Sequence, residues 1–437
     1  MPSMYRLAEI IENNGALSMV GEISFHPSAP YFAATYQNIN EVRIYDSLTR
    51  KLLQVLRNPE SQLDGPHGVL LTEKYLLTSN AHNLKRPGTI NVYRSDATLK
   101  KPIPLFVQRP IQLFQSPFDH LREPHTLAMR NGRLVITYCE NVMPSGAIVS
   151  YGFNEETGEI AGPLDKIESW FSEYGDSKGV CFNADGTKIL VTFESDKQWS
   201  VLGRILLSFA SNKHLPVSDK LRKFSYKTIN SLTRQTKFVN DTLRGIHGKK
   251  SVELENAGLR YTKPTKNGIA VFSITTDGKI ARIPEKIILR KKFCRLENID
   301  IVDGTCVITD LVNQAFFLYD LTQDPKFKNP VQIVNLGNAT PHGAKFAPDG
   351  SLLVITSVGL KILNQEPQFD GWVSPREDKI FVFERASVSS PKSLKIQWTT
   401  HRRKEAVQSS ISGSLRAPRL LFSPVESTAK TPNPPIA

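Results

Sequence analysis

The sequence lacks the residues and runs that define several common protein classes. It has four cysteines in 437 residues, and none stands in a C-x-x-C pair or at zinc-ligand spacing, which argues against a disulfide framework. No apolar run approaches the length of a membrane span, and the acidic N-terminal stretch has no signal-peptide pattern. We therefore expect a cytoplasmic protein with free thiols at Cys139, Cys181, Cys294 and Cys306.

Motifs of the large nucleotide-dependent and hydrolase classes are also missing. The sequence contains no nucleophile elbow, no phosphate-cradling glycine loop and no dinucleotide fingerprint. Any chemistry must therefore depend on dispersed histidines and carboxylates that the fold brings together.

The excess of positive over negative charge is confined to two segments. Residues 204–267 hold 14 Lys and Arg against 4 Asp and Glu, and residues 387–437 hold 8 against 2, so the +13 net charge leaves −3 for the rest. The first segment has loosely helical apolar spacing, which suits an anionic partner. A solvated loop is the alternative. Nucleic acid is not an expected partner.

A repeating unit runs through the remaining sequence. Six anchor residues each precede, by 11 to 14 residues, a threonine that ends an apolar run. The anchors are Gly21, His67, His125, Lys178, Asn298 and His342, and the threonines are Thr35, Thr78, Thr137, Thr192, Thr309 and Thr356. Turn dipeptides such as Asn131-Gly132 and Asp303-Gly304 lie between the anchor and the threonine, and a third strand with period-two alternation follows the threonine.

This pattern predicts an all-β, six-bladed β-propeller of four-stranded antiparallel blades, with a seventh, degenerate blade as the alternative. We expect an N-terminal segment at 1–14, the propeller at 15–400, and a disordered basic tail at 401–437. The basic insert at 204–267 interrupts the fourth blade. Either Tyr5–Ile10 or Leu394–Trp398 is expected to supply a closing strand.

Innermost propeller strands start at the central channel, so the anchors should line it. His67, His125 and His342 fall on one half of the ring, where they are candidate ligands of a divalent, zinc-like ion. The alternative is structural: a histidine repeated at each blade base can bond the neighbouring blade. Just past the threonines, polar strand ends supply catalytic candidates, Glu194 and Asp310, and Glu123 precedes Pro124-His125. Further polar members of this set are His82, Glu140 and Asp196, and the candidate substrate-binding residues are Lys178, Asn298 and Tyr138.

Residues 20–385 resemble the lactonase-type propellers, the group of 6-phosphogluconolactonase and the YVTN repeats. The motifs that carry the resemblance are Phe346–Gly350, Phe272–Ile280 and Gly146–Tyr151. Those lactonases have seven blades, and the count of six is similar instead to the gluconolactonase and senescence-marker family. That resemblance implies a divalent metal, such as calcium, held by a glutamate, asparagines and an aspartate. Val20-Gly21-Glu22 is similar to the family's opening Gly-Glu, although Glu22 is one residue out of register with the anchors.

Two functions remain open on this evidence. The resemblance implies a lactonase-like enzyme that hydrolyses a small cyclic ester or sugar lactone at the channel mouth, with a metal or a histidine activating water. The alternative is a non-catalytic scaffold that binds a protein or anionic partner through its face and its basic insert.

Overall fold

The computed structural model describes most of the repeat region. The described residues are 4–12, 18–81, 87–96, 105–118, 121, 123–139, 146–168, 171, 175–194, 267–290, 293–337, 339–358, 360–363, 366–373 and 378–386. They all belong to the first of two compact units, Met1–Ser387, and the second unit, Val388–Ala437, lies outside them. The basic insert up to residue 266 and the basic tail therefore also lie outside the described residues.

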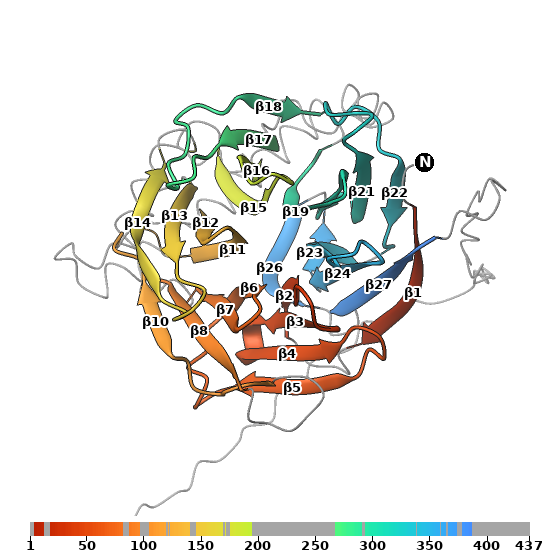
Figure 1. The fold of residues 1–437 in the computed structure, drawn as a ribbon. Coiled ribbons are helices and arrows are strands. Elements are labelled where there is room, and N and C mark those ends of the chain that lie inside the picture. Colours follow the sequence, from red (N-terminus) through yellow and green to blue (C-terminus); the bar gives the residue numbers. More distant parts are fainter. Residues whose placement is uncertain are drawn as a thin grey trace, which may run out of the picture. The chain divides into compact units, whose positions relative to one another are not determined.

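Six four-stranded antiparallel blades form a ring, which confirms the predicted propeller (Figure 1). Blade one contains β2 (Val20–Phe25), β3 (Tyr31–Tyr36), β4 (Glu41–Asp46) and β5 (Leu52–Arg57). Blade two contains β6 (Pro66–Leu71), β7 (Tyr75–Asn80), β8 (Thr89–Asp96) and β10 (Gln112–Gln115), with β9 (Leu105–Phe106) also paired to β8. Blade three contains β11 (Glu123–Arg130), β12 (Arg133–Cys139), β13 (Ala147–Phe153) and β14 (Ile160–Ile167).

The other three blades follow the same order from the centre outward. Blade four contains β15 (Asp176–Phe182), β16 (Lys188–Glu194), β17 (Gly268–Ser273) and β18 (Lys286–Leu289). Blade five contains β19 (Leu296–Val302), β20 (Thr305–Asp310), β21 (Ala315–Asp320) and β22 (Gln332–Asn335). Blade six contains β23 (Thr340–Phe346), β24 (Leu352–Val358), β27 (Lys379–Arg385) and β1 (Tyr5–Glu12), and a separate hairpin of β25 (Leu360–Leu363) and β26 (Glu366–Val373) lies between β24 and β27 in sequence.

The N-terminal strand closes the ring. β1 pairs antiparallel with β27, from Tyr5 opposite Arg385 to Glu12 opposite Lys379, so the first strand of the chain completes the last blade. The buried side chain of Arg50, from blade one, forms ion pairs with Glu9 of β1 and Glu384 of β27. The expected closing strand at Tyr5–Ile10 is therefore confirmed, and the other candidate, Leu394–Trp398, lies outside the described residues.

Burial differs between the inner and outer strands of a blade. Every residue of β2, β3, β6 and β7 is buried, because each blade is sandwiched between two others and its inner strands pack on both faces. The outer strands β10 and β22 instead alternate between partly buried and exposed residues. The described residues contain no helix of the length and hydropathy needed to cross a bilayer.

A β-bulge occurs near the start of every innermost strand. The regular pairing breaks between Val20 and Ile23 in blade one, and equivalent breaks recur in the other five blades. Each break leaves two consecutive residues in the bulge. The first bulge residues are Gly21, His67, His125, Lys178, Glu297 and His342, and the second are Glu22, Gly68, Thr126, Gly179, Asn298 and Gly343.

Six buried hydroxyl groups, which we call the hydroxyl belt, connect these bulges around the ring. Each hydroxyl accepts the backbone N–H of the second bulge residue of its own blade, at 2.7–3.1 Å. It lies 2.5–3.1 Å from the carbonyl oxygen of the next blade's first bulge residue, to which it donates. The belt consists of Thr35, Ser79, Thr137, Thr192, Thr309 and Thr356.

Two sequence assignments were wrong by one residue. Thr78 is buried, but it lies opposite Val69 in the pairing, and the belt position in blade two is occupied by Ser79. In blade five the residue equivalent to the histidines is Glu297, and Asn298 is the second bulge residue. Both errors arise because apolar spacing cannot distinguish two adjacent polar residues in a bulge or opposite one.

Candidate functional site

Side chains from non-adjacent blades meet at the centre of the ring. The ring centroids of His125, in blade three, and His342, in blade six, are 5.7 Å apart. Glu22, in blade one, contacts Thr126 in blade three and Asn298 in blade five. Because blades this far apart in the ring can meet only near its axis, the bulge residues occupy the centre of the propeller. Figure 1 shows the innermost strands surrounding this centre.

The three histidines converge there. His67 lies between the other two, with ring centroids 3.8 Å from His125 and 5.0 Å from His342. One nitrogen of each ring lies within 4.8 Å of the corresponding nitrogens of the other two. All three side chains are buried, with 2–4% of their surface exposed. This grouping has the ligand type of a three-histidine metal site, and its nitrogens are near enough to one another to be candidates for one.

Burial keeps the three imidazoles neutral. It lowers the pKa of His67 and His125 well below the usual value, and lowers that of His342 to about 3. The positive charge of Lys178 lowers all three further. A neutral imidazole keeps a lone pair on one nitrogen, so these side chains can coordinate a cation at neutral pH without first losing a proton.

The three rings have different hydrogen-bond partners. His67 bonds the backbone of His125, and His342 bonds the backbone of Gly21, in each case on the next blade. Their Nδ1 atoms are buried and have no hydrogen-bond partner among the described residues. The Nδ1 atom of His125 lies 3.1 Å from the hydroxyl oxygen of Thr126. The backbone bonds agree with a structural role, while the two unpartnered nitrogens leave room for a ligand.

Glu22 is a central residue that the sequence interpretation placed outside the ring of anchors. Its Oε1 accepts the Thr126 hydroxyl at 3.2 Å, and its Oε2 accepts the side-chain amide of Asn298. Burial raises the pKa of Glu22 to about 7, although both hydrogen bonds oppose the shift. This carboxyl is therefore suited to gain and lose a proton near neutral pH.

The second bulge positions alternate between side chains and glycine around the ring. Glu22, Thr126 and Asn298 come from blades one, three and five, and the other three blades have glycine. A Cβ at Gly68 would lie 2.2 Å from the carbonyl oxygen of His125. Glycine at these positions allows the next blade to approach closely enough for the three remaining side chains to meet.

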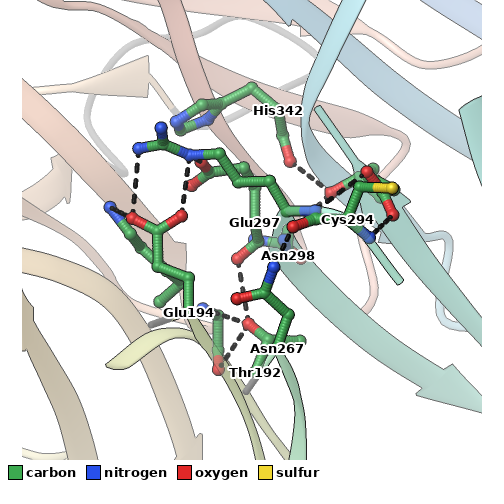
Figure 2. Close-up of polar contacts among 12 residues, drawn as sticks. Thr192, Glu194, Asn267, Cys294, Glu297, Asn298 and His342 are labelled. Atoms are coloured by element: carbon green, nitrogen blue, oxygen red, sulfur yellow. Dashed lines mark hydrogen bonds and ion pairs between the residues drawn. The ribbon is translucent and has the colours of Figure 1, made fainter. Parts of the chain in front are cut away.

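A buried ion-pair cluster lies beside the histidines. Glu194 Oε1 is 3.2 Å from Lys178 Nζ, and its Oε2 is 2.7 Å from Arg295 Nε. Arg295 Nε is also 3.2 Å from Glu297 Oε1. Burial opposes the charge of Lys178, but nearby Cys139, Glu194 and Glu297 hold its pKa well above the usual value. Figure 2 shows Glu194, Glu297, Asn298 and His342 in one neighbourhood, supplied by β16, β19 and β23.

Three other candidates lie in different surroundings. Asp310 accepts the backbone N–H groups of Cys294 and Arg295 at 2.8 and 3.1 Å, and burial raises its pKa to about 6. Glu123 begins β11, opposite Cys139, and is partly exposed. The Tyr138 hydroxyl lies 3.1 Å from that of Tyr151, within the apolar core shared by blades two and three. His82, Glu140 and Asp196 lie outside the described residues.

Sequence reasoning did not single out Arg295 and Glu297, and it noted Glu22 only through the family's opening Gly-Glu, one residue out of register with the anchors. The available signal was the bulge itself. If the two residues that follow Val20 and Leu296 in the innermost strands are both assigned to the ring centre, Glu22 and Glu297 are found beside the anchors Gly21 and Asn298. Arg295 precedes β19 and could not be found this way, because its position depends on the backbone held by Asp310.

No protein-family model and no curated protein sequence matches this chain. Among solved structures, a luciferin-regenerating enzyme has a TM-score of 0.50 at 8% identity, covering 87% of this chain and 96% of its own. Regucalcin from Agrobacterium tumefaciens str. C58, described as a calcium-binding protein, has a TM-score of 0.47 at 11% identity, covering 87% and 94%. A protein described as a gluconolactonase has a TM-score of 0.45 at 9% identity, covering 88% and 92%. At these identities the likeness to solved structures shows the propeller fold alone.

Proposed function

We propose that this protein is a lactonase-like hydrolase that holds a divalent metal ion at the centre of its propeller and opens a small cyclic ester, such as a sugar lactone. His67, His125 and His342 would hold the ion. One observation carries the proposal: three neutral, buried imidazoles converge from three blades, and two have Nδ1 atoms without a hydrogen-bond partner among the described residues.

The chemistry of this donor set favours a zinc-like ion over calcium. Neutral imidazole suits zinc and other transition metals, whereas calcium requires oxygen ligands. A buried polar nitrogen without a partner is also unfavourable, and a bound cation would satisfy it. The charges of Lys178 and Arg295 are matched by Glu194 and Glu297, and Glu22 adds a further carboxyl.

When bound, such an ion lowers the pKa of water and polarises a carbonyl oxygen. In the hydrolysis, water oxygen bonds to the ester carbonyl carbon, the ring C–O bond breaks, and a hydroxy acid forms. Glu22 is the carboxyl best suited to accept the proton that the water loses and to return it to the ring oxygen as the C–O bond breaks, because its pKa is about 7. We propose that Glu194, which pairs with two cations, holds Lys178 and Arg295 in place to bind substrate oxygens.

A non-catalytic scaffold is the second candidate. It is favoured by the hydrogen bonds of His67 and His342 to the backbone of the next blade and by the slight exposure of all three rings. In that case the histidines order the ring, and an anionic partner would bind through the basic insert.

Metal analysis and activity measurements separate the two candidates. Protein purified without chelator should contain about one zinc-like ion per chain by mass spectrometry, as a single three-ligand site requires. It should also hydrolyse at least one of a panel of sugar lactones, and chelation should abolish both properties.

His67→Gln and His342→Gln should lose the metal. The matched control is His26→Gln, because His26 is also buried but bonds the backbone of Ser28 and Ala29. Wild-type protein that binds no added Zn²⁺ and opens no lactone would contradict the proposal and favour the scaffold.

A further inference from the structure

A chain of hydrogen bonds runs from His125 to Glu22. The Thr126 hydroxyl oxygen lies 3.1 Å from His125 Nδ1, and the hydroxyl donates its hydrogen to Glu22 Oε1 at 3.2 Å. A hydroxyl has one hydrogen, so the contact with His125 must use a proton carried by Nδ1. His125 is therefore protonated on Nδ1, and its Nε2 keeps the lone pair.

The other two histidines are held in the opposite tautomer. His67 and His342 each bond the backbone of the next blade, and in both rings Nδ1 is the nitrogen without a partner among the described residues. Their Nε2 atoms are therefore the donors, and their Nδ1 atoms keep the lone pairs. Convergence of three lone pairs at the ring centre requires Nε2 of His125 but Nδ1 of the others.

We propose that Glu22, acting through Thr126, fixes the tautomer and orientation of His125 so that its Nε2 faces the metal position. Toward His125, Glu22 acts as a positioning residue, a role separate from the proton acceptance proposed above, and this role rests on the proposed metal binding. A carboxylate that orients a ligating histidine commonly contributes 10- to 100-fold, in order of magnitude, to metal affinity.

Glu22 is itself held by hydrogen bonds of its backbone and of its carboxyl, and a glycine of blade six leaves room for it. Its backbone N–H donates to Thr35 at 3.0 Å, its Oε2 accepts the amide of Asn298, and Gly343 on blade six leaves space beside its Cα. The charged or titratable groups that act on it are Lys345 and Glu297. Because Asn298 donates an N–H to Oε2, Oε1 is the oxygen that faces Thr126. The hydrogen bonds then run from His125 Nδ1 to Thr126 and from Thr126 to Glu22.

This arrangement makes Glu22→Gln a specific test. The glutamine carbonyl oxygen should replace Oε2 opposite the Asn298 amide, which turns the glutamine NH₂ toward Thr126. The hydroxyl of Thr126 would then accept from residue 22 and donate to His125 Nδ1. The substitution should therefore reverse the chain and move the proton of His125 to Nε2.

The tautomer is measured without metal and above pH 7, where Glu22 is ionised, by ¹⁵N NMR of histidine-labelled, metal-free protein with His125 assigned from a His125→Gln variant. Wild type and Thr126→Ser should show Nδ1–H at His125, and both Glu22→Gln and Thr126→Val should show Nε2–H. Thr192→Val is the control, since it removes a belt hydroxyl whose hydrogen bonds within the described part of the chain go to Gly179 and Glu297. Nε2–H at His125 in wild type, or an unchanged tautomer in both test variants, would overturn the proposal.

Zn²⁺ affinity is the second readout. Glu22→Gln and Thr126→Val should weaken binding by about 10- to 100-fold, while Thr126→Ser and Thr192→Val stay within about threefold. If the tautomer changes but affinity does not, Glu22 does not position a metal ligand. If wild type shows the expected tautomer but binds no Zn²⁺, the proposed function fails while the control of His125 by Glu22 stands.

Discussion

A buried carboxyl at position 22 connects three blades by its two oxygens and its backbone N–H. The side chains at positions 126 and 298 that bond it belong to blades three and five. Burial disfavours the charged form and raises the pKa of Glu22 from 4.5 to about 7. The same burial lowers the pKa values of the three histidines, so the imidazoles are neutral and add no positive charge to the centre of the ring.

The stability contributed by Glu22 should depend on pH. Its folded pKa is raised, so the folded state binds more protons than the unfolded state between pH 4.5 and about 7, and stability falls as pH rises through this window. Glu22→Gln should remove this dependence, gaining up to about 3 kcal/mol relative to wild type between pH 4.5 and 7, from ~1.4 kcal/mol per pKa unit. Urea denaturation across the pH range measures the difference. A constant difference between the two proteins would show that Glu22 has a normal pKa.

At the scale of the element, the bulge in each innermost strand determines what reaches the centre. It places two consecutive residues there, and its backbone groups would be unsatisfied without the hydroxyl belt. Thr356 shows the arrangement: it accepts the N–H of Gly343 at 2.8 Å and donates to the carbonyl of Gly21 in the next blade. The repeated threonines are therefore explained by structure and not by catalysis.

Removing one belt hydroxyl should destabilise the protein. Thr356→Val leaves the buried N–H of Gly343 without its partner and removes one of the two donors to the Gly21 carbonyl, and we expect a loss of about 1–3 kcal/mol. Thr356→Ser keeps the hydroxyl and should lose less. Thermal or urea unfolding of both variants provides the measurement. Equal losses in the two variants would mean that the methyl group of Thr356, and not its hydroxyl, stabilises the junction between blades six and one.

At the scale of the whole molecule, the ring is closed by its two ends. β1 completes blade six, so residues 5–12 and 379–385 belong to one sheet although most of the chain separates them. Blade four shows the opposite case. β16 and β17 pair from Phe193–Gly268 to Lys188–Ser273, although residues 195–266 separate the two strands in sequence.

Replacement of residues 195–266 by a short turn should leave the propeller folded. The two strands already pair up to Phe193 and Gly268, so a turn of a few residues can rejoin them, and long insertions add little loop-closure entropy. Circular dichroism and the melting temperature should match those of the full chain. Loss of soluble protein would show that the insert contributes to the core. If the scaffold function holds instead, the shortened chain should lose its anionic partner while it remains folded.

The sequence alone predicted most of the strands, the hairpin turns and a ring of six blades, with seven as the alternative. These depend on local chemistry: side-chain alternation along a strand, and positive φ at dipeptides such as Asn131-Gly132 and Asp303-Gly304, which both adopt it. The closing role of Tyr5–Ile10 was also visible, because an unassigned strand remained at that end.

Only the tertiary structure decided which residues meet at the centre. The pairing of strands distinguished Ser79 from Thr78 and Glu297 from Asn298, which apolar spacing could not do. The contacts of Glu22 with Thr126 and Asn298 join residues 104 and 276 positions apart. Such contacts exist only after the ring closes, because closure, and not any local preference, sets the distance across its axis.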